Sequence, residues 1–334
     1  MASFFGRANY SYNSKYYLTA TFRVDGSSKF PPGNKWGYFP SGAFAWNINE
    51  EESIKKVKVI SNGKLRTSYG VSGNNRVSDF AYLPKLGFPP ISAYSFNAST
   101  PTKGVVISEM GNDKLKWESV HQTDIGLDLG FFKNRIELVV DVYRRTTVDM
   151  LLNAEKPYAT GYPNVFENIG KLQNDGLEIS VNTKNIKTRN FSWESSFNIS
   201  FNRNKILALT RNQNEMFKNN GFHFSYTESL YLSKVGMPAG MFYGYQWLGN
   251  YQYADFKETS PGVYVLKDEI ADNGSGRANV KPGDIKYKDV NGDGTVNDLD
   301  KGLMGRSLPI HSGGFSNNFT YKNFDLNVFF QWNY

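Results

Sequence analysis

Hydrophobic and polar residues alternate with a period of two along several stretches of the chain. In the six clearest stretches one face carries apolar side chains and the other mostly polar ones: 16–25, 122–131, 135–145, 176–183, 193–202 and 324–334. Weaker copies of the pattern lie at 4–12, 38–48, 64–72 and 313–321. Because successive side chains of a strand point to opposite faces, the sequence predicts about ten strands and an all-β fold.

The lengths of these strands and of their connections predict a transmembrane barrel. Several strands have about 9–11 residues, enough to cross a bilayer when tilted, whereas strands of soluble proteins average about 5–6. At one end the connections are short, at 13–15, 132–134, 184–190 and 322–323, with 49–63 intermediate. At the other end they are long, at 25–37, 73–119, 146–173 and 203–312. Short periplasmic turns opposite long extracellular loops are typical of an antiparallel outer-membrane barrel.

A barrel of this kind turns apolar side chains toward lipid and polar ones toward its lumen. The residues expected to face lipid include Leu127, Leu138, Val140, Ile179 and Ile199. The residues expected to face the lumen include Asp128, Glu137, Glu178 and Asn198. A charge facing lipid is costly and a charge facing water is tolerated, so luminal carboxylates are expected to pair with luminal arginines. The carboxylates are Asp124, Asp128, Glu137, Asp141 and Glu178, and the arginines are Arg7, Arg23, Arg66 and Arg145.

Composition removes several other classes of protein. The mean hydropathy is −0.50, and no apolar run is long enough for a transmembrane helix. The chain has no Cys, which excludes thiolate nucleophiles and zinc-thiolate sites. Its net charge of +7 is spread along the chain, so we expect no nucleic-acid partner. No nucleophile elbow, phosphate-binding or dinucleotide-binding motif is present, and the protein is not expected to be an enzyme.

Six ordered segments of the chain resemble the SusC/RagA family, the TonB-dependent outer-membrane transporters of the Bacteroidetes. These segments are 4–10 with 17–30, 37–46, 65–75, 115–118, 168–170 with 174–178, and 282–287. They cover nearly the whole chain in the order and spacing of the family.

The resemblance implies a barrel of about 22 strands, an N-terminal plug domain and a location in the cell outer membrane. It also implies a SusD-like surface lipoprotein over the mouth, TonB acting through the plug, and an oligosaccharide or peptide as cargo. Residues 1–334 are expected to be a partial barrel domain in contact with outer-membrane lipid, with the plug and the final strands absent. Residues 203–312 are expected to be a long extracellular loop region with few regular strands.

Residues 289–300 fit the calcium-loop pattern, in which alternate side chains converge oxygen ligands on one hard cation. The predicted ligands of a structural Ca²⁺ are Asp289, Asn291, Asp293, Thr295, Asn297 and Asp300. The last ligand position holds Asp rather than the longer Glu, and no amphipathic helices flank the loop. A tight acidic turn is therefore the alternative, since Asn-Gly and Asp-Gly favour turns without any metal.

Aromatic residues in the long loops are candidate platforms for sugar rings, because a flat ring covers the apolar face of a pyranose. The candidates are Tyr82, Tyr94, Phe96, Tyr158, Tyr162 and Phe222. Packing among the loops is the alternative for each of them. For the chain as a whole, the alternative to a transporter is a secreted, soluble β-fold module that binds glycans and carries a dockerin-like calcium loop.

Overall fold

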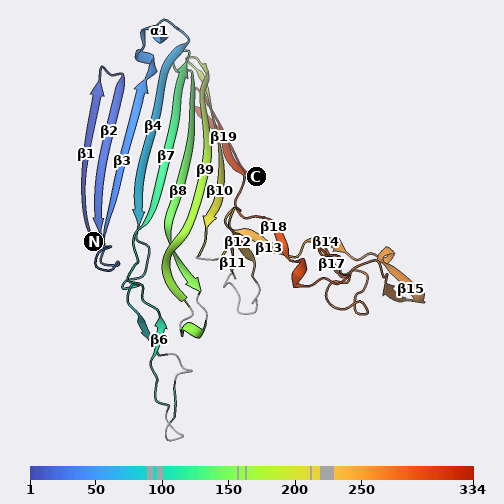
Figure 1. The fold of residues 1–334 in the computed structure, drawn as a ribbon. Helices are drawn as coiled ribbons and strands as arrows, with labels where there is room; N and C mark the ends of the chain where they lie inside the picture. The colour runs from blue at the N-terminus through green and yellow to red at the C-terminus, as the bar shows by residue number, and fades with distance from the viewer. Residues whose placement is uncertain (89–92, 96–100, 156–157, 162–163, 211–212, 219–228) are drawn as a thin grey trace. The chain divides into compact units, whose positions relative to one another are not determined.

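The computed structural model describes the chain apart from residues 89–92, 96–100, 156–157, 162–163, 211–212 and 219–228. It forms two compact units (Figure 1). The sheet unit comprises Met1–Asn214 and Pro309–Tyr334, and the insert unit comprises Glu215–Leu308. No helix in the described part of the chain is long and apolar enough to cross a membrane.

The sheet unit is built on one ten-stranded sheet, in which each strand pairs antiparallel with the next one along the chain. Its strands are β1 (Ala2–Tyr12), β2 (Tyr16–Gly26), β3 (Trp36–Asn47), β4 (Ile60–Asn74), β7 (Glu118–Phe131), β8 (Ile136–Glu155), β9 (Asn164–Lys187), β10 (Phe191–Ala208), β19 (His311–Tyr321) and β20 (Phe324–Asn333). Figure 1 shows β1 to β4 and β7 to β10 side by side in that order. All ten predicted strands are confirmed.

The register of the sheet gathers the apolar residues on one face. Leu127 lies opposite Val140, Val140 opposite Ile179, and Ile179 opposite Ile199. Because directly opposed residues of neighbouring strands point to the same side, these four form one apolar row. The next row toward the short turns holds Leu129, Leu138, Val181, Phe197, Phe315 and Phe330. The sheet therefore has an apolar face and a polar face, as the alternation predicts.

Three strands extend well beyond the predicted alternation at the end of the long connections. β8 continues to Glu155, β9 already begins at Asn164, and β10 continues to Ala208. Leu151 still pairs with Asn168 in this extension, past bulges between Thr147 and Leu151. Here consecutive apolar residues at 150–152 break the alternation, and Leu151 and Phe166 pack against buried residues of the long connections. The pattern of side chains therefore stops before the strand does.

An apolar cluster lies in the sheet unit where the long connections leave β2, β4 and β8. Its centre holds Phe30 and Leu115, which have no exposed surface, together with Trp117. The Trp117 indole N–H donates to the carbonyl of Lys35 at 3.1 Å, so residues 82 positions apart are joined. Within the described part of the same connection, β5 (Lys85–Gly87) and β6 (Val106–Glu109) form a small hairpin sheet.

The connection between β3 and β4 contains the 3-10 turn η1 (Ile48–Glu50) and the one-turn helix α1 (Glu52–Lys55). Glu51 lies between them, forms an ion pair of 2.7 Å with Lys15 and accepts from the indole N–H of Trp46 at 3.1 Å. The pKa of Glu51 is lowered chiefly by the hydrogen bond from Lys15. This contact ties the first two short connections together at one end of the sheet.

The insert unit corrects the expectation of a loop with few regular strands. It contains a four-stranded sheet and two two-stranded sheets, and their strands have three to five residues. The four-stranded sheet consists of β11 (Glu215–Lys218), β12 (Tyr231–Lys234), β13 (Met241–Gly244) and β18 (Gly302–Arg306). The two pairs are β14 (Trp247–Asn250) with β17 (Ile285–Tyr287), and β15 (Phe256–Ser260) with β16 (Val263–Leu266). Strands this short do not run through enough alternations to be recognised by period alone.

The insert unit has a core of its own, made of Tyr251, Phe256, Leu266 and Val280. Tyr251 is 1% exposed, and its hydroxyl donates to the carbonyl of Ala271 at 2.6 Å. Burial raises the pKa of Tyr251 to about 12, with smaller contributions from Asp272 and Asp255. The hydroxyl therefore stays protonated at neutral pH and anchors residue 271 to the core.

Adjacent residues of β10 give a direct test of the two faces. Ile199→Arg, on the apolar face, is expected to lower the free energy of unfolding by about 2–4 kcal/mol if that face meets lipid near the bilayer midplane. Asn198→Arg is the matched control on the polar face, where Asn198 lies opposite Gly314 and is exposed. Urea unfolding of the full-length protein in lipid vesicles measures both. Equal losses in the two variants would contradict the assignment of the faces.

Candidate functional site

The centre of the polar face is an arginine that binds two aspartates on neighbouring strands. Arg66 of β4 donates from Nε and Nη2 to the two carboxylate oxygens of Asp128 on β7, at 2.9 and 2.7 Å. The same Nη2 reaches Asp141 on β8 at 2.9 Å. The three side chains are 25–37% exposed, so the group is partly shielded from solvent. The predicted pairing with luminal carboxylates is confirmed for Arg66, whereas Arg7 donates to Thr21 and Arg23 pairs with Asp25.

A glycine makes room for this arrangement. Gly126 lies directly opposite both Arg66 and Asp141 in the sheet. A Cβ atom at this position would lie 2.3 Å from Oδ1 of Asp141 and 2.7 Å from Cζ of Arg66. Both distances are too short for nonbonded atoms, so the ion pairs cross the sheet only because residue 126 has no side chain.

A hollow of about 490 Å³ lies beside this group on the polar face. Its wall carries charges of both signs and neutral amides, supplied by Asp124, Tyr143, Arg145, Asn174, Glu178 and Asn202 among others. Asp124 accepts from Gln122 at 3.0 Å and from the hydroxyl of Ser68 at 3.3 Å. The hollow therefore offers donors and acceptors to a polar solute.

The predicted loop aromatics do not form one described platform. Tyr82 is partly buried and packs against the apolar cluster around Phe30, so loop packing accounts for it. Tyr94 is 65% exposed and forms an isolated antiparallel bridge with Thr102. Tyr158 belongs to the short turn η3 (Tyr158–Thr160). Phe96, Tyr162 and Phe222 lie outside the described residues.

The predicted calcium loop is tightly organised by hydrogen bonds from its own backbone. Asp289 accepts from the N–H groups of Gly292 and Gly294 at 2.6 and 2.9 Å. Both glycines have positive φ, 76° and 85°, the left-handed region that favours glycine. Asp293 accepts from the N–H of Thr295 at 2.9 Å. These bonds produce the sharp turn that the sequence predicts.

Asp300 closes the loop from its far end. It is 1% exposed and accepts from the backbone N–H groups of Val290 and Asn297, both at 2.8 Å. These backbone hydrogen bonds, led by the one from Asn297, lower the pKa of Asp300, so the carboxylate is ionised at neutral pH. Asp300 therefore holds the two ends of the loop together through charge-assisted hydrogen bonds.

Three predicted calcium ligands meet at Asp293, whose Oδ2 accepts from the amide groups of Asn291 and Asn297 at 3.0 and 3.4 Å. Thr295 donates its hydroxyl to Asp272 at 3.1 Å. Among the described residues, no three His, Cys, Asp or Glu side chains converge in the manner of a metal site. The hydrogen bonds account for the shape of the loop without an ion, and calcium stays a prediction.

The ion pairs of Arg66 predict a loss of stability that depends on its partners. Arg66→Met leaves two carboxylates unpaired and is expected to lower the free energy of unfolding by about 1–2 kcal/mol, between the values for exposed and buried pairs. Adding Asp128→Asn is expected to restore part of the loss. Arg7→Met is the control, since Arg7 donates only to the hydroxyl of Thr21, at 3.2 Å. Urea unfolding in vesicles with equal losses for Arg66→Met and Arg7→Met would contradict the prediction.

Comparison with known proteins agrees with this architecture. The chain matches the family model "TonB dependent receptor-like, beta-barrel" over residues 1–334. It is 38% identical over 331 residues to TonB-dependent receptor P3 of Formosa agariphila, covering 99% of this chain and 31% of that protein. It is 35% identical over 337 residues to TonB-dependent receptor SusC of Bacteroides thetaiotaomicron, covering 98% of this chain and 30% of that one.

A solved structure shows the same fold. The structure of the RagAB peptide transporter aligns with a TM-score of 0.75 at 24% identity, covering 98% of this chain and 33% of that one. The chain thus spans about a third of the length of the proteins that it matches. The membrane-barrel interpretation is confirmed, and the soluble-module alternative is set aside. The chain belongs to the β-barrel family of TonB-dependent receptors, outer-membrane proteins, and is of the SusC/RagA type.

Proposed function

We propose that the full-length protein is a TonB-linked importer of oligosaccharides or peptides and that its cargo passes along the polar face of the sheet. The observation that carries this proposal is the polar surface around Arg66, Asp128 and Asp141, together with the adjoining hollow of about 490 Å³. In an outer-membrane barrel the polar face lines the lumen. Its donors and acceptors replace those of water for a passing polar solute.

Two classes of cargo suit this wall. The amides of Gln122, Asn174 and Asn202 fit an oligosaccharide, whose hydroxyl groups both donate and accept. The charges of Arg145 and Glu178, in the same hollow, favour a peptide with charged groups of both signs. A SusD-like surface lipoprotein and TonB, acting through a plug, are the proposed partners. The resemblance to the SusC/RagA family supports both partners, and the RagAB structures, described as a peptide transporter, support peptide cargo.

Two neighbouring residues of β10 test whether the polar face is the route. Asn202→Trp places a large ring in the hollow and is expected to reduce cargo uptake by the full-length protein several-fold. Phe201→Trp places a similar ring on the apolar face and is expected to leave uptake unchanged. Uptake of labelled oligosaccharide and peptide mixtures is measured in cells that lack the native gene and express each variant.

The same assay separates the two cargo classes. A gene deletion that abolishes uptake of only one mixture identifies the class. Unchanged uptake of both mixtures after deletion would overturn import as the function. Equal uptake by the two tryptophan variants would overturn the polar face as the route.

We also propose that the loop 289–300 binds a structural Ca²⁺. The gathering of Asn291, Asp293 and Asn297 supports it, although both amides would have to turn their oxygens toward the ion. Chelation is expected to speed proteolytic cleavage within 289–300 in the full-length protein and to have no such effect in Asp293→Ala.

The matched control is Asp298→Ala, because Asp298 lies in the same loop but is not a predicted ligand. It pairs with Lys301 at 2.9 Å and is 86% exposed. This variant is expected to keep the response to chelation. A cleavage rate that is the same with calcium and with chelator in the unaltered protein would contradict the calcium proposal and favour the acidic turn.

A further inference from the structure

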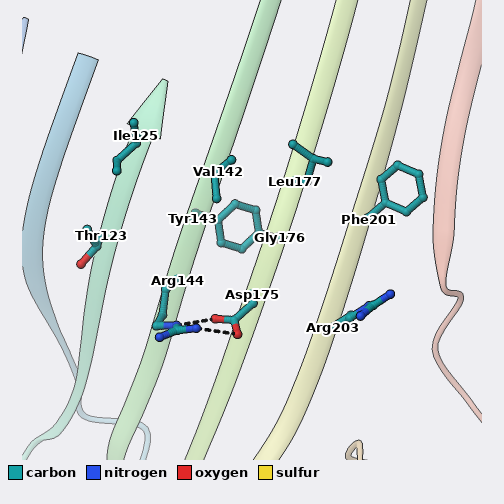
Figure 2. Close-up of a pocket in the computed structure, with 10 residues that line it drawn as sticks. All are labelled: Thr123, Ile125, Val142, Tyr143, Arg144, Asp175, Gly176, Leu177, Phe201 and Arg203. Atoms are coloured by element: carbon teal, nitrogen blue, oxygen red, sulfur yellow. Dashed lines mark hydrogen bonds and ion pairs between the residues drawn. The ribbon is translucent and has the colours of Figure 1, made fainter. Parts of the chain in front are cut away.

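A row of polar and charged side chains crosses the apolar face near the end of the long connections. Thr123 lies opposite Arg144, Arg144 opposite Asp175, and Asp175 opposite Arg203. We call these four residues the charged row. Figure 2 shows them on β7, β8, β9 and β10, with the apolar Ile125, Val142, Leu177 and Phe201 two residues farther along the same strands.

The cations of this row outnumber the anions. Arg144 forms a two-pronged pair with Asp175, at 2.7 and 3.1 Å, and Gln173 donates to the same carboxylate at 2.7 Å. Arg203, on the other side of Asp175, is exposed and makes no hydrogen bond or ion pair with the residues that the structure describes. Lys205, two residues farther from the apolar rows, is also exposed. One carboxylate thus faces three cations.

The charged row and the neighbouring apolar residues Ile125, Val142, Leu177 and Phe201 line one shallow groove of about 700 Å³. Its apolar part is open to the surroundings, since Ile125 and Val142 are 54% and 52% exposed. Its charged part is open as well, with the Arg144 side chain 65% exposed. The groove therefore joins a cationic end to an apolar floor, both without a cover from the described residues of the sheet unit.

The place of the groove in the membrane follows from the faces and the connections. The apolar face meets lipid, and the end with long connections is extracellular in barrels of this class. A charge on the lipid face costs about 2–4 kcal/mol at the midplane but only about 0–1 kcal/mol near the interface. The charged row therefore lies where the acyl chains of the outer leaflet give way to headgroups.

We propose that this groove binds an outer-leaflet lipid that carries phosphate on its headgroup. The guanidinium of Arg203 contacts the phosphate, because a planar fork of N–H donors matches phosphate oxygens. The acyl chains lie over Leu177, Phe201 and the apolar rows nearer the short turns. Charge complementarity selects this occupant, since a neutral lipid leaves Arg203 unpaired and a free anion leaves the apolar floor uncovered. The inference rests on the outer-membrane assignment and not on the import of any cargo.

Native mass spectrometry of the delipidated full-length protein in detergent tests the proposal, with lipid A and enzymatically dephosphorylated lipid A as probes. The unaltered protein is expected to retain lipid A in preference to the dephosphorylated form. Arg203→Ala is expected to weaken retention about fivefold, the usual effect of one cation near a charged lipid surface. Asp175→Asn frees Arg144 and is expected to strengthen retention by a similar factor.

The control is Arg7→Ala, which removes a cation from the polar face and is expected to leave lipid retention unchanged. Opposite effects of Arg203→Ala and Asp175→Asn would support the site even if one variant folded poorly. Equal retention of the two lipids, or of lipid A by the unaltered protein and Arg203→Ala, would overturn the proposal. Displacement of lipid A by millimolar inorganic phosphate would overturn it too, because the site would then be one for a free anion.

Discussion

The requirement that every backbone N–H and C=O in a bilayer finds a partner within the protein governs the sheet. Each of the ten strands pairs with its neighbour in the sheet, and the longest strand, β9, has 24 residues. Once the ladder is set, each side chain has only two directions available. Leu127 and Asp128 differ by one position and meet opposite environments, so the chemistry of each face follows from register.

Charge is distributed in the sheet according to the same rule. Arg66 binds Asp128 and Asp141 on the polar face, where water or neighbouring charges compensate it. Arg144 and Asp175 occur on the apolar face near the end of the long connections, and they neutralise each other there. Arg203 is the exception on this face, because no carboxylate of the described residues pairs with it.

The sequence predicts the strands, their order and their faces because a bilayer imposes a period of two that few soluble folds sustain for so long. It does not predict the extension of β8 to Glu155, since consecutive apolar residues at 150–152 break the alternation. Arg144 and Asp175 occupy apolar-face positions and lie 31 residues apart, so the alternation indicated only that a strand was ending. Tyr82 shows a further limit, because composition cannot tell a packed ring from an exposed one.

The insert unit leaves the sheet after β10 and the chain returns at β19, and these two strands are directly paired from Phe201 with His311 to Phe191 with Tyr321. The entry and exit of roughly a hundred residues are therefore held together by a ladder that does not include them. Lengthening such a connection adds only a slowly growing entropic cost. Descendants of one barrel can thus exchange this whole unit, core included, by recombination between the two strands. For protein engineers the same junction is a point at which a foreign domain can replace the insert unit without interrupting the sheet.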